Sequence, residues 1–211
     1  MLNNKTLAVV VPAYNEEKQI GVVIETMPDF VDRIVIVNDL SSDGTAEVVR
    51  GFLKTGHNQT RLEIKPKEIK RTFHNEAEIR LQELNREELA YYPKSEVVNQ
   101  NPERERIIFI NNLVNSGVGG GIARGYKWCK DNYIDCTAVM AGDAQMDPDE
   151  LESICLPVVN DGVDYVKGNR LIHGSAYMFI PKTRFFGNSV LSILTKMASG
   201  YWRISDTQTG Y

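Results

Sequence analysis

Short runs of consecutive apolar residues alternate along this chain with segments whose apolar residues recur every three or four positions. The runs are rich in valine and isoleucine and end at turn-forming residues, which is typical of strands buried on both faces of a parallel sheet. They occupy residues 7–11, 34–37, 107–110 and 137–140. Helical spacing follows the first three runs, at 15–27, 45–52 and 122–130. Strands joined by crossover helices predict an α/β fold, a three-layer α/β/α sandwich with a mainly parallel central sheet.

One charged and polar segment, residues 57–106, interrupts this alternation. It contains a helix-like stretch at 76–89, whose apolar residues Ile79, Leu81 and Leu84 form only a modest stripe. Two interpretations fit the segment: a solvated insertion with one surface helix, or a lid or subunit contact of a homo-oligomer. We expect the rest of residues 1–211 to form a single domain.

Length, composition and charge narrow the class of protein. The chain has 211 residues, enough for one sizeable domain. Apolar residues make up 42% and charged residues 25%, and the net charge of −4 argues against a nucleic-acid partner. No stretch reaches the roughly 20 apolar residues of a spanning helix, so we expect a cytoplasmic protein that could still work at a membrane surface. Cys129, Cys136 and Cys155 lack a metal-ligand spacing and are expected to be reduced, partly buried thiols.

Polar residues follow the first two predicted strands, at the sheet edge where ligands bind in parallel α/β folds. After the first strand, Tyr14 offers a flat ring and Glu16 an acceptor, a pair able to hold a nucleobase and ribose. The same segment could instead be a strand-to-helix turn with capping residues. After the second strand, Asp39 could accept hydrogen bonds from base N–H groups. Asp43 and Thr45 are better explained as a turn and a helix N-cap.

A glycine-rich stretch, residues 115–123, follows the third predicted strand. Such a turn can place backbone N–H groups against phosphate, and Asn115 and Gly117 are its candidate nucleotide contacts. Its spacing differs from the dinucleotide fingerprint G-x-G-x-x-G. The glycines could instead only permit close packing of a helix on the sheet.

The fourth predicted strand leads into two oxygen-bearing side chains, Asp143 and Gln145. In an extended chain, residues two positions apart point to the same side. Such donors suit a hard cation that keeps waters and binds phosphate oxygens, and that would neutralise a departing diphosphate. Asp147 and Pro148 instead indicate a helix start, with Asp147 as the N-cap.

Six segments together resemble the motifs of the family 2 glycosyltransferases, in that family's order and with suitable spacing. They are VVPAYNEE, IVIVNDLSSDGT, NSGVGGGIARG, VMAGDAQMDP, GNR and DTQTGY. The resemblance covers most of the chain except the charged insertion. It is closest to the branch of dolichol-phosphate mannose synthases and bacterial polyprenyl-phosphate sugar transferases. It implies a GT-A fold and an inverting transfer from a UDP- or GDP-linked sugar.

The resemblance also implies roles for individual residues. Those that would contact the nucleotide are Pro12, Ala13, Tyr14, Glu16, Val37, Asp39, Asn115, Gly117, Gly142 and Asp143. Asp143 and Gln145 would bind Mg²⁺ or Mn²⁺, and Arg170 would reach the diphosphate or the sugar unless it is simply a surface arginine. Asp206 and Gln208 would face the reacting sugar and the acceptor.

Two positions depart from the family pattern. Ala141 stands where the family usually has an acidic residue, which removes one metal contact. Val118 stands where many relatives have lysine, which removes one phosphate contact. We therefore expect weak metal binding in the absence of the nucleotide.

The acceptor implied by the resemblance is polyprenyl or dolichyl phosphate. The alternatives are a saccharide hydroxyl in cell-surface polysaccharide synthesis, with Asp206 as the base, a non-catalytic nucleotide-sugar binding module, and a pyrophosphorylase. The helix-like segment 184–197 either packs on the domain or contacts the membrane surface at its cytoplasmic side. Because the chain stops inside the last motif, we expect the C-terminal part of the domain to be truncated.

Overall fold

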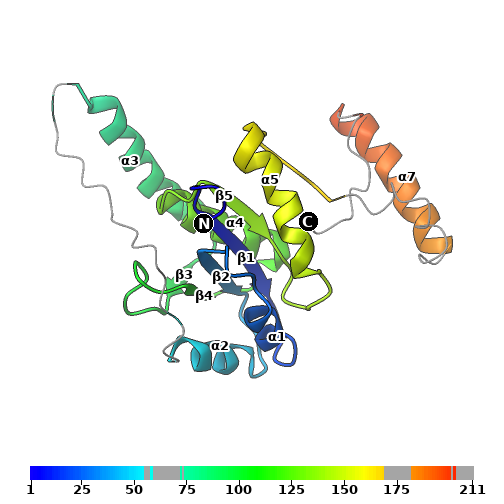
Figure 1. Ribbon diagram of the computed structural model, residues 1–211, viewed down its shortest axis with the longest axis horizontal. Helices are drawn as coiled ribbons and strands as arrows, with labels where there is room; N and C mark the ends of the chain where they lie inside the picture. The colour runs from blue at the N-terminus through cyan, green and yellow to red at the C-terminus, as the bar shows by residue number, and fades with distance from the viewer. Residues whose placement is uncertain (55–57, 59–71, 73, 169–181, 201, 203–211) are drawn as a thin grey trace. The chain divides into compact units, whose positions relative to one another are not determined.

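The computed structural model of the protein describes residues 1–54, 58, 72, 74–168, 182–200 and 202, apart from the side chains of Arg184 and Phe185 (Figure 1). The chain forms two compact units, Met1–Val163 and Asp164–Tyr211. The sheet and the residues that line the cavity described below belong to the first unit.

The first unit is built on a five-stranded sheet with the order β3-β4-β2-β1-β5 (Figure 1). The parallel strands are β1 (Leu7–Ala13), β2 (Arg33–Asn38), β4 (Ile107–Asn112) and β5 (Cys136–Val139). They coincide with the four predicted strands, which confirms the α/β class. The edge strand β3 (Ser95–Val97) pairs antiparallel with β4 and was not predicted. It is short and largely exposed, so its sequence carries little hydrophobic signal.

Helices cover both faces of the sheet, as the three-layer prediction requires. Helix α4 (Gly117–Asp131) packs on β1, β2 and β5. The core on this face consists of Ala8, Val10, Val35, Val37, Ile108, Ile110, Trp128 and Cys129. Residues that alternate with these point to the other face, where the Arg50 guanidinium lies 5.9 Å from the Phe109 ring centre. That face carries α2 (Thr45–Leu53) against β4, α1 (Ile20–Glu25) against α2, and α5 (Leu151–Asp161) against β5.

Two helices begin at residues other than the predicted ones. Helix α1 begins at Ile20, not at residue 15, because Asn15 has a φ of 59°, in the left-handed region that a right-handed helix does not use. Helix α4 begins at Gly117, not at residue 122, so most of the glycine-rich stretch is helical. Its glycines permit close packing, since a Cβ on Gly125 would lie 2.3 Å from Val10 Cγ1.

The charged insertion contains α3 (Glu76–Glu88), which confirms the predicted helix, and a short 3₁₀ helix η1 (Leu89–Tyr91). No residue of α3 is buried. Hydrogen bonds attach α3 to α4 and to Tyr133 in the turn that follows α4. The buried ammonium of Lys127 donates to the Asn85 carbonyl at 2.6 Å, and Lys130 Nζ lies 2.9 Å from Glu88 Oε2. The lid and subunit-contact interpretations stay predictions.

The second unit contains α7 (Lys182–Ser199), in agreement with the predicted helical spacing there. Its exposed apolar side chains are Phe186, Val190, Leu191, Ile193, Leu194 and Met197. Residues 165–168 have no regular secondary structure. Within the described part of the chain, no helix has both the length and the apolar character needed to cross a membrane.

Candidate functional site

A cavity of about 350 Å³ lies at the carboxyl edge of the sheet, among the segments that follow β1, β2, β4 and β5. Its lining residues are Pro12, Ala13, Tyr14, Glu16, Asp39, Asn115, Gly117, Val118, Ala141, Gly142 and Asp143. The structure therefore brings together every predicted nucleotide-binding residue except Val37. The volume falls within the range of roughly 300 to 1,000 Å³ that is usual for small-molecule sites.

Three lining or neighbouring positions differ from the prediction. The side chain of Val37 is fully buried in the core on the α4 face and does not line the cavity. Val118 and Ala141 line the cavity although neither was named as a contact. These are the two positions at which the sequence departs from its family pattern, and that departure was the available signal.

The carboxylate of Asp39 holds the start of α4. Its Oδ1 accepts from Asn112 Nδ2 at 2.8 Å and from Ser116 Oγ at 2.7 Å, and its two oxygens lie 2.9 and 3.0 Å from Ser116 N. Burial alone would raise the pKa of Asp39, but these bonds and the nearby Gly117 N–H dipole together lower it below its ordinary value. The negative charge also stabilises the positive end of the α4 dipole.

This cap limits what the glycine-rich segment can offer to a ligand. The N–H groups of Ser116 and Gly117 already donate to Asp39 and Asn115 side-chain oxygens, at 2.9 Å and 3.3 Å. A phosphate placed there would also meet the Asp39 charge. The packing interpretation fits the glycines better, because a Cβ on Gly121 would lie 3.4 Å from the Pro12 Cβ.

The turn after β1 is joined to the turn after β2 by reciprocal hydrogen bonds. Asn15 Oδ1 accepts from Ser42 N at 2.9 Å, and Glu16 N donates to Thr45 Oγ1 at 2.8 Å. Asp43 Oδ1 accepts from Thr45 N at 3.0 Å, in the turn role predicted for it. Gly44, and not Thr45, occupies the N-cap position of α2. Backbone and Asn15 groups thus fix the turn and leave the Glu16 side chain to line the cavity.

The loop after β5 reaches the cavity because a glycine allows a close approach to β1. Gly142 N donates to the Pro12 carbonyl at 3.3 Å. A Cβ on Gly142 would lie 3.1 Å from that carbonyl oxygen and 3.4 Å from Ala13 Cβ. A larger residue here would require the loop or the Pro12 carbonyl to move by a few tenths of an ångström.

Asp143 lies in a turn and not in an extended strand. Strand β5 ends at Val139, Ala144 has a φ of 56°, and Asp143 Oδ1 accepts from Gln145 N at 3.1 Å. The prediction that strand alternation places the two side chains on one side is therefore wrong, and Gln145 is not among the residues that line the cavity. Asp147 does cap the following 3₁₀ helix η2 (Pro148–Glu150), accepting from Asp149 N at 3.0 Å, which confirms its structural role.

Acidic side chains crowd the Asp143 side of the cavity. Burial raises the pKa of Glu16, and the nearby charges of Asp143 and then Asp43 raise it further. Carboxylate oxygens are suitable ligands for Mg²⁺ or Mn²⁺, and a cation would relieve this repulsion. Among the residues that the structure describes, however, no group of three or more His, Cys, Asp or Glu side chains is placed to hold a metal. Ala141 adds no carboxylate to the lining.

The three predicted catalytic residues, Arg170, Asp206 and Gln208, lie outside the described residues. Their roles stay predictions. The described cavity therefore contains predicted nucleotide contacts and none of the predicted catalytic residues.

The fold and cavity define an α/β domain with a ligand site at the carboxyl edge of its parallel strands. The chain belongs to glycosyl transferase family 2, whose model matches residues 8–76 and 93–211. This membership confirms the resemblance, the fold class and the class of enzyme. The match leaves out residues 77–92, which comprise most of α3 and all of η1.

Two curated proteins are similar over nearly the whole chain. A UDP-N-acetylglucosamine–dolichyl-phosphate N-acetylglucosaminyltransferase of Methanococcus voltae is 28% identical over 208 residues, 98% of this chain and 68% of the relative. An uncharacterized protein of Methanocaldococcus jannaschii is 23% identical over 210 residues, 99% of this chain and 64% of the relative. The chain thus spans about two thirds of the length of each.

Proposed function

We propose that this domain transfers a sugar from a nucleotide-diphosphate sugar to polyprenyl or dolichyl phosphate. The observation that carries the proposal is the cavity, which gathers the predicted nucleotide contacts from four strand ends at one edge of the sheet. The similar Methanococcus voltae protein uses, by its name, a UDP-linked sugar and dolichyl phosphate. A UDP-sugar is therefore the first donor to test, and a GDP-sugar the second.

Base recognition is assigned to Tyr14 and Asp39. The Tyr14 ring, 51% exposed, offers a face on which a base can stack. A carboxylate has about four acceptor sites, and Asp39 Oδ1 already accepts from Asn112 and Ser116. The base N–H would therefore meet Oδ2, whose bond to Ser116 N is shared with Oδ1.

The metal site is assigned to Asp143, with Gln145 as a further oxygen donor and Glu16 close by. A bound Mg²⁺ or Mn²⁺ would neutralise negative charge on the departing nucleoside diphosphate. With few protein ligands, the diphosphate has to complete the coordination shell, so affinity for the metal depends on the nucleotide. Arg170 would add a positive charge beside the diphosphate or sugar.

The acceptor sets the demand for a base. A lipid phosphate is anionic near neutral pH and attacks the anomeric carbon without a strong base, whereas a saccharide hydroxyl needs a carboxylate such as Asp206 to take its proton. Gln208 would contact the reacting sugar or acceptor. The exposed apolar side chains of α7 suit contact with a membrane surface, which would place the protein at the cytoplasmic membrane face.

The test uses the full-length protein with a panel of UDP- and GDP-sugars, Mg²⁺ or Mn²⁺, and a short polyprenyl phosphate. The cognate donor should stabilise the protein by about 2.7 kcal/mol at a hundredfold excess over its Kd, and the acceptor should become glycosylated. Asp143→Asn should abolish the metal-dependent part of both effects. Asp147→Asn is the matched control in the same loop, because Asp147 caps η2 and does not line the cavity.

Three outcomes would contradict the proposal in different ways. Full metal-dependent transfer by Asp143→Asn would remove Asp143 from the metal site. Transfer to a saccharide hydroxyl, and none to the lipid phosphate, would change the acceptor class. Donor binding without any transfer would make the domain a nucleotide-sugar binding module.

A further inference from the structure

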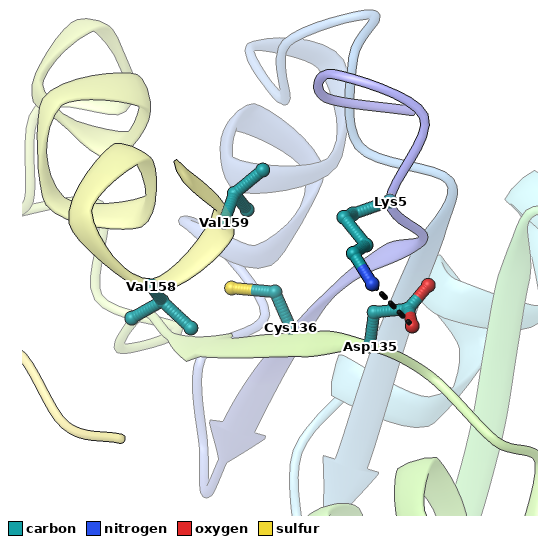
Figure 2. A pocket seen from close by; sticks show the side chains of 5 residues that line it. All are labelled: Lys5, Asp135, Cys136, Val158 and Val159. Carbon is teal, nitrogen blue, oxygen red and sulfur yellow. Dashed lines mark ion pairs between the residues drawn. The ribbon is translucent and has the colours of Figure 1, made fainter. Parts of the chain in front are cut away.

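A second, smaller cavity of about 100 Å³ lies at the opposite edge of the sheet from the candidate site. It is lined by Lys5, Asp135, Cys136, Val158 and Val159 (Figure 2). Cys136 is the first residue of β5, so this cavity lies at the amino edge of the parallel strands. The proposed transfer reaction makes no use of it.

The thiol of Cys136 faces helix α5. Figure 2 shows its sulfur pointing toward the turn of α5 that carries Val158 and Val159. Cys155 lies three and four positions before these valines and therefore on the same face of the helix. Each thiol lies close enough to the other to shift its pKa, both residues are buried at 5% and 2% exposure, and neither is in a disulfide.

The two thiols differ in their access to the cavity. Cys136 lines it and Cys155 does not, so a small molecule held there meets the Cys136 thiol first. The neighbouring Cys155 lowers the pKa of the Cys136 thiol, against burial and the nearby Asp135 charge, which would raise it. The neighbouring Cys136 thiol and burial raise the pKa of Cys155. The cavity is large enough for a molecule slightly bigger than water.

We propose that Cys136 and Cys155 form a dithiol site at which a small hydroperoxide produces a reversible disulfide between β5 and α5. The Cys136 thiolate attacks one peroxide oxygen, the O–O bond breaks, and Cys136 becomes a sulfenic acid as hydroxide leaves. The Cys155 sulfur then attacks the Cys136 sulfur, and the sulfenic oxygen leaves as water. In balance, two thiols and one hydrogen peroxide give one disulfide and two waters.

The disulfide would affect the loop that contributes to the larger cavity. Residues 136–155 include the turn with Gly142 and Asp143, so the new bond would close a loop around that turn. It would restrict the unfolded chain and raise the Tm by about 5 to 10 °C, from the usual stabilisation by a disulfide that closes a loop of this size. This proposal does not depend on which donor or acceptor the domain uses.

The third cysteine serves as an internal control. Cys129 is buried on the α4 side of the sheet, in the core cluster with Val10, whereas Cys136 pairs in register with Leu7 and faces α5. The sheet therefore separates Cys129 from the other two thiols. Burial also raises the pKa of Cys129 to about 12, which leaves almost no thiolate at neutral pH.

The experiment treats the reduced full chain with hydrogen peroxide and maps the cysteines by mass spectrometry without reduction. Because Glu150 and Glu152 lie between the two cysteines, a glutamate-specific protease separates their peptides, and only a disulfide would hold them together. Support would be a Cys136–Cys155 peptide pair about 2 Da lighter than the sum of its parts, formed with the rise in Tm and reversed by dithiothreitol. Cys129→Ala should behave like the wild type.

A second variant tests the order of the steps without relying on the disulfide. Cys155→Ala should accumulate a sulfenic acid on Cys136 that dimedone traps, whereas Cys136→Ala should leave Cys155 reduced under the same treatment. The proposal is overturned if both thiols stay fully alkylatable in the wild type while surface methionines oxidise. It is equally overturned if the cross-link involves Cys129, or if dimedone labels Cys155 in preference to Cys136.

Discussion

The carboxylate of Asp39 lies 2.9 and 3.0 Å from the backbone nitrogen of Ser116, a residue 77 positions later in the chain. Asp39 directly follows β2, and Ser116 directly precedes α4. A carboxylate at the end of a strand therefore caps a helix that packs on one face of the same sheet. Both residues border or adjoin the larger cavity. One side chain thereby fixes the helix start and lines the ligand site, which favours a preformed cavity.

Replacing Asp39 with alanine should destabilise the domain strongly. The change removes the acceptor of Ser116 Oγ and Ser116 N in a partly buried place, leaves Asn112 Nδ2 with Ser116 Oγ alone, and removes the charge at the start of α4. We expect a loss of about 3 kcal/mol in the free energy of unfolding, measured by urea denaturation. The exposed Asp29→Ala control should change it by less than about 0.5 kcal/mol. Equal losses in the two variants would contradict the capping role.

Two glycines in α4 should respond to alanine in opposite directions. A Cβ on Gly125 would lie 2.3 Å from Val10 Cγ1, between helix and sheet, so Gly125→Ala should cost about 1 to 3 kcal/mol. Gly119 has open space around its would-be Cβ, so Gly119→Ala should gain up to about 1 kcal/mol from helix propensity. Thermal denaturation of both proteins gives the comparison. Adding Val10→Ala to Gly125→Ala should recover part of the loss, and a lack of recovery would argue against the contact.

The attachment of α3 should depend on Lys127 more than on Lys130. Lys127 has a fully buried side chain that donates to the Asn85 carbonyl and to Asp131 at 2.5 Å, whereas Lys130 is half exposed where it meets Glu88. We expect Lys127→Ala to speed backbone hydrogen exchange across Glu76–Glu88 by tenfold or more, the equivalent of about 1.4 kcal/mol. Lys130→Ala should change the free energy of opening of α3, measured in the same exchange experiment, by less than about 1 kcal/mol, as is usual for surface ion pairs. A larger effect from Lys130→Ala would reverse the assignment.

The main strands were predictable because each is a short apolar run that local sequence specifies. Strand β3 was not, since its pairing with β4 depends on tertiary context and its side chains are largely exposed. The start of α4 was also missed. Glycine has a low helix propensity, and only the close approach to Val10 and Pro12, which no local pattern reveals, makes glycines suitable there.

The candidate site shows the same division between local and long-range information. Its position at the strand ends followed from the fold, and the residues that line it could be named from the motifs. The capping role of Asp39 could not be predicted, because its partner lies 77 positions away. The geometry at Asp143 was misjudged for a different reason: Ala144 has a positive φ, which is uncommon for alanine, so an extended chain was the natural expectation.

The pH dependence of stability should report on the acidic side of the cavity through Glu16. Burial, followed by the charges of Asp143 and Asp43, raises the pKa of Glu16 above its ordinary value of 4.5. The folded protein therefore holds this proton more tightly than the unfolded chain does. The resulting stability is full below pH 4.5 and is lost as the pH rises through the folded-state pKa.

Glu16→Gln removes this ionisation, so its Tm relative to the wild type should be higher at about pH 7 than at about pH 4. The exposed Glu25→Gln in α1 is the control and should show no such change between the two pH values. Asp143→Asn should reduce the pH-dependent loss, because it removes one of the charges that raise the pKa of Glu16. If Glu16→Gln instead tracked the wild type across the whole range, Glu16 and Asp143 would not be coupled, and Glu16 would lose its place beside the proposed metal site.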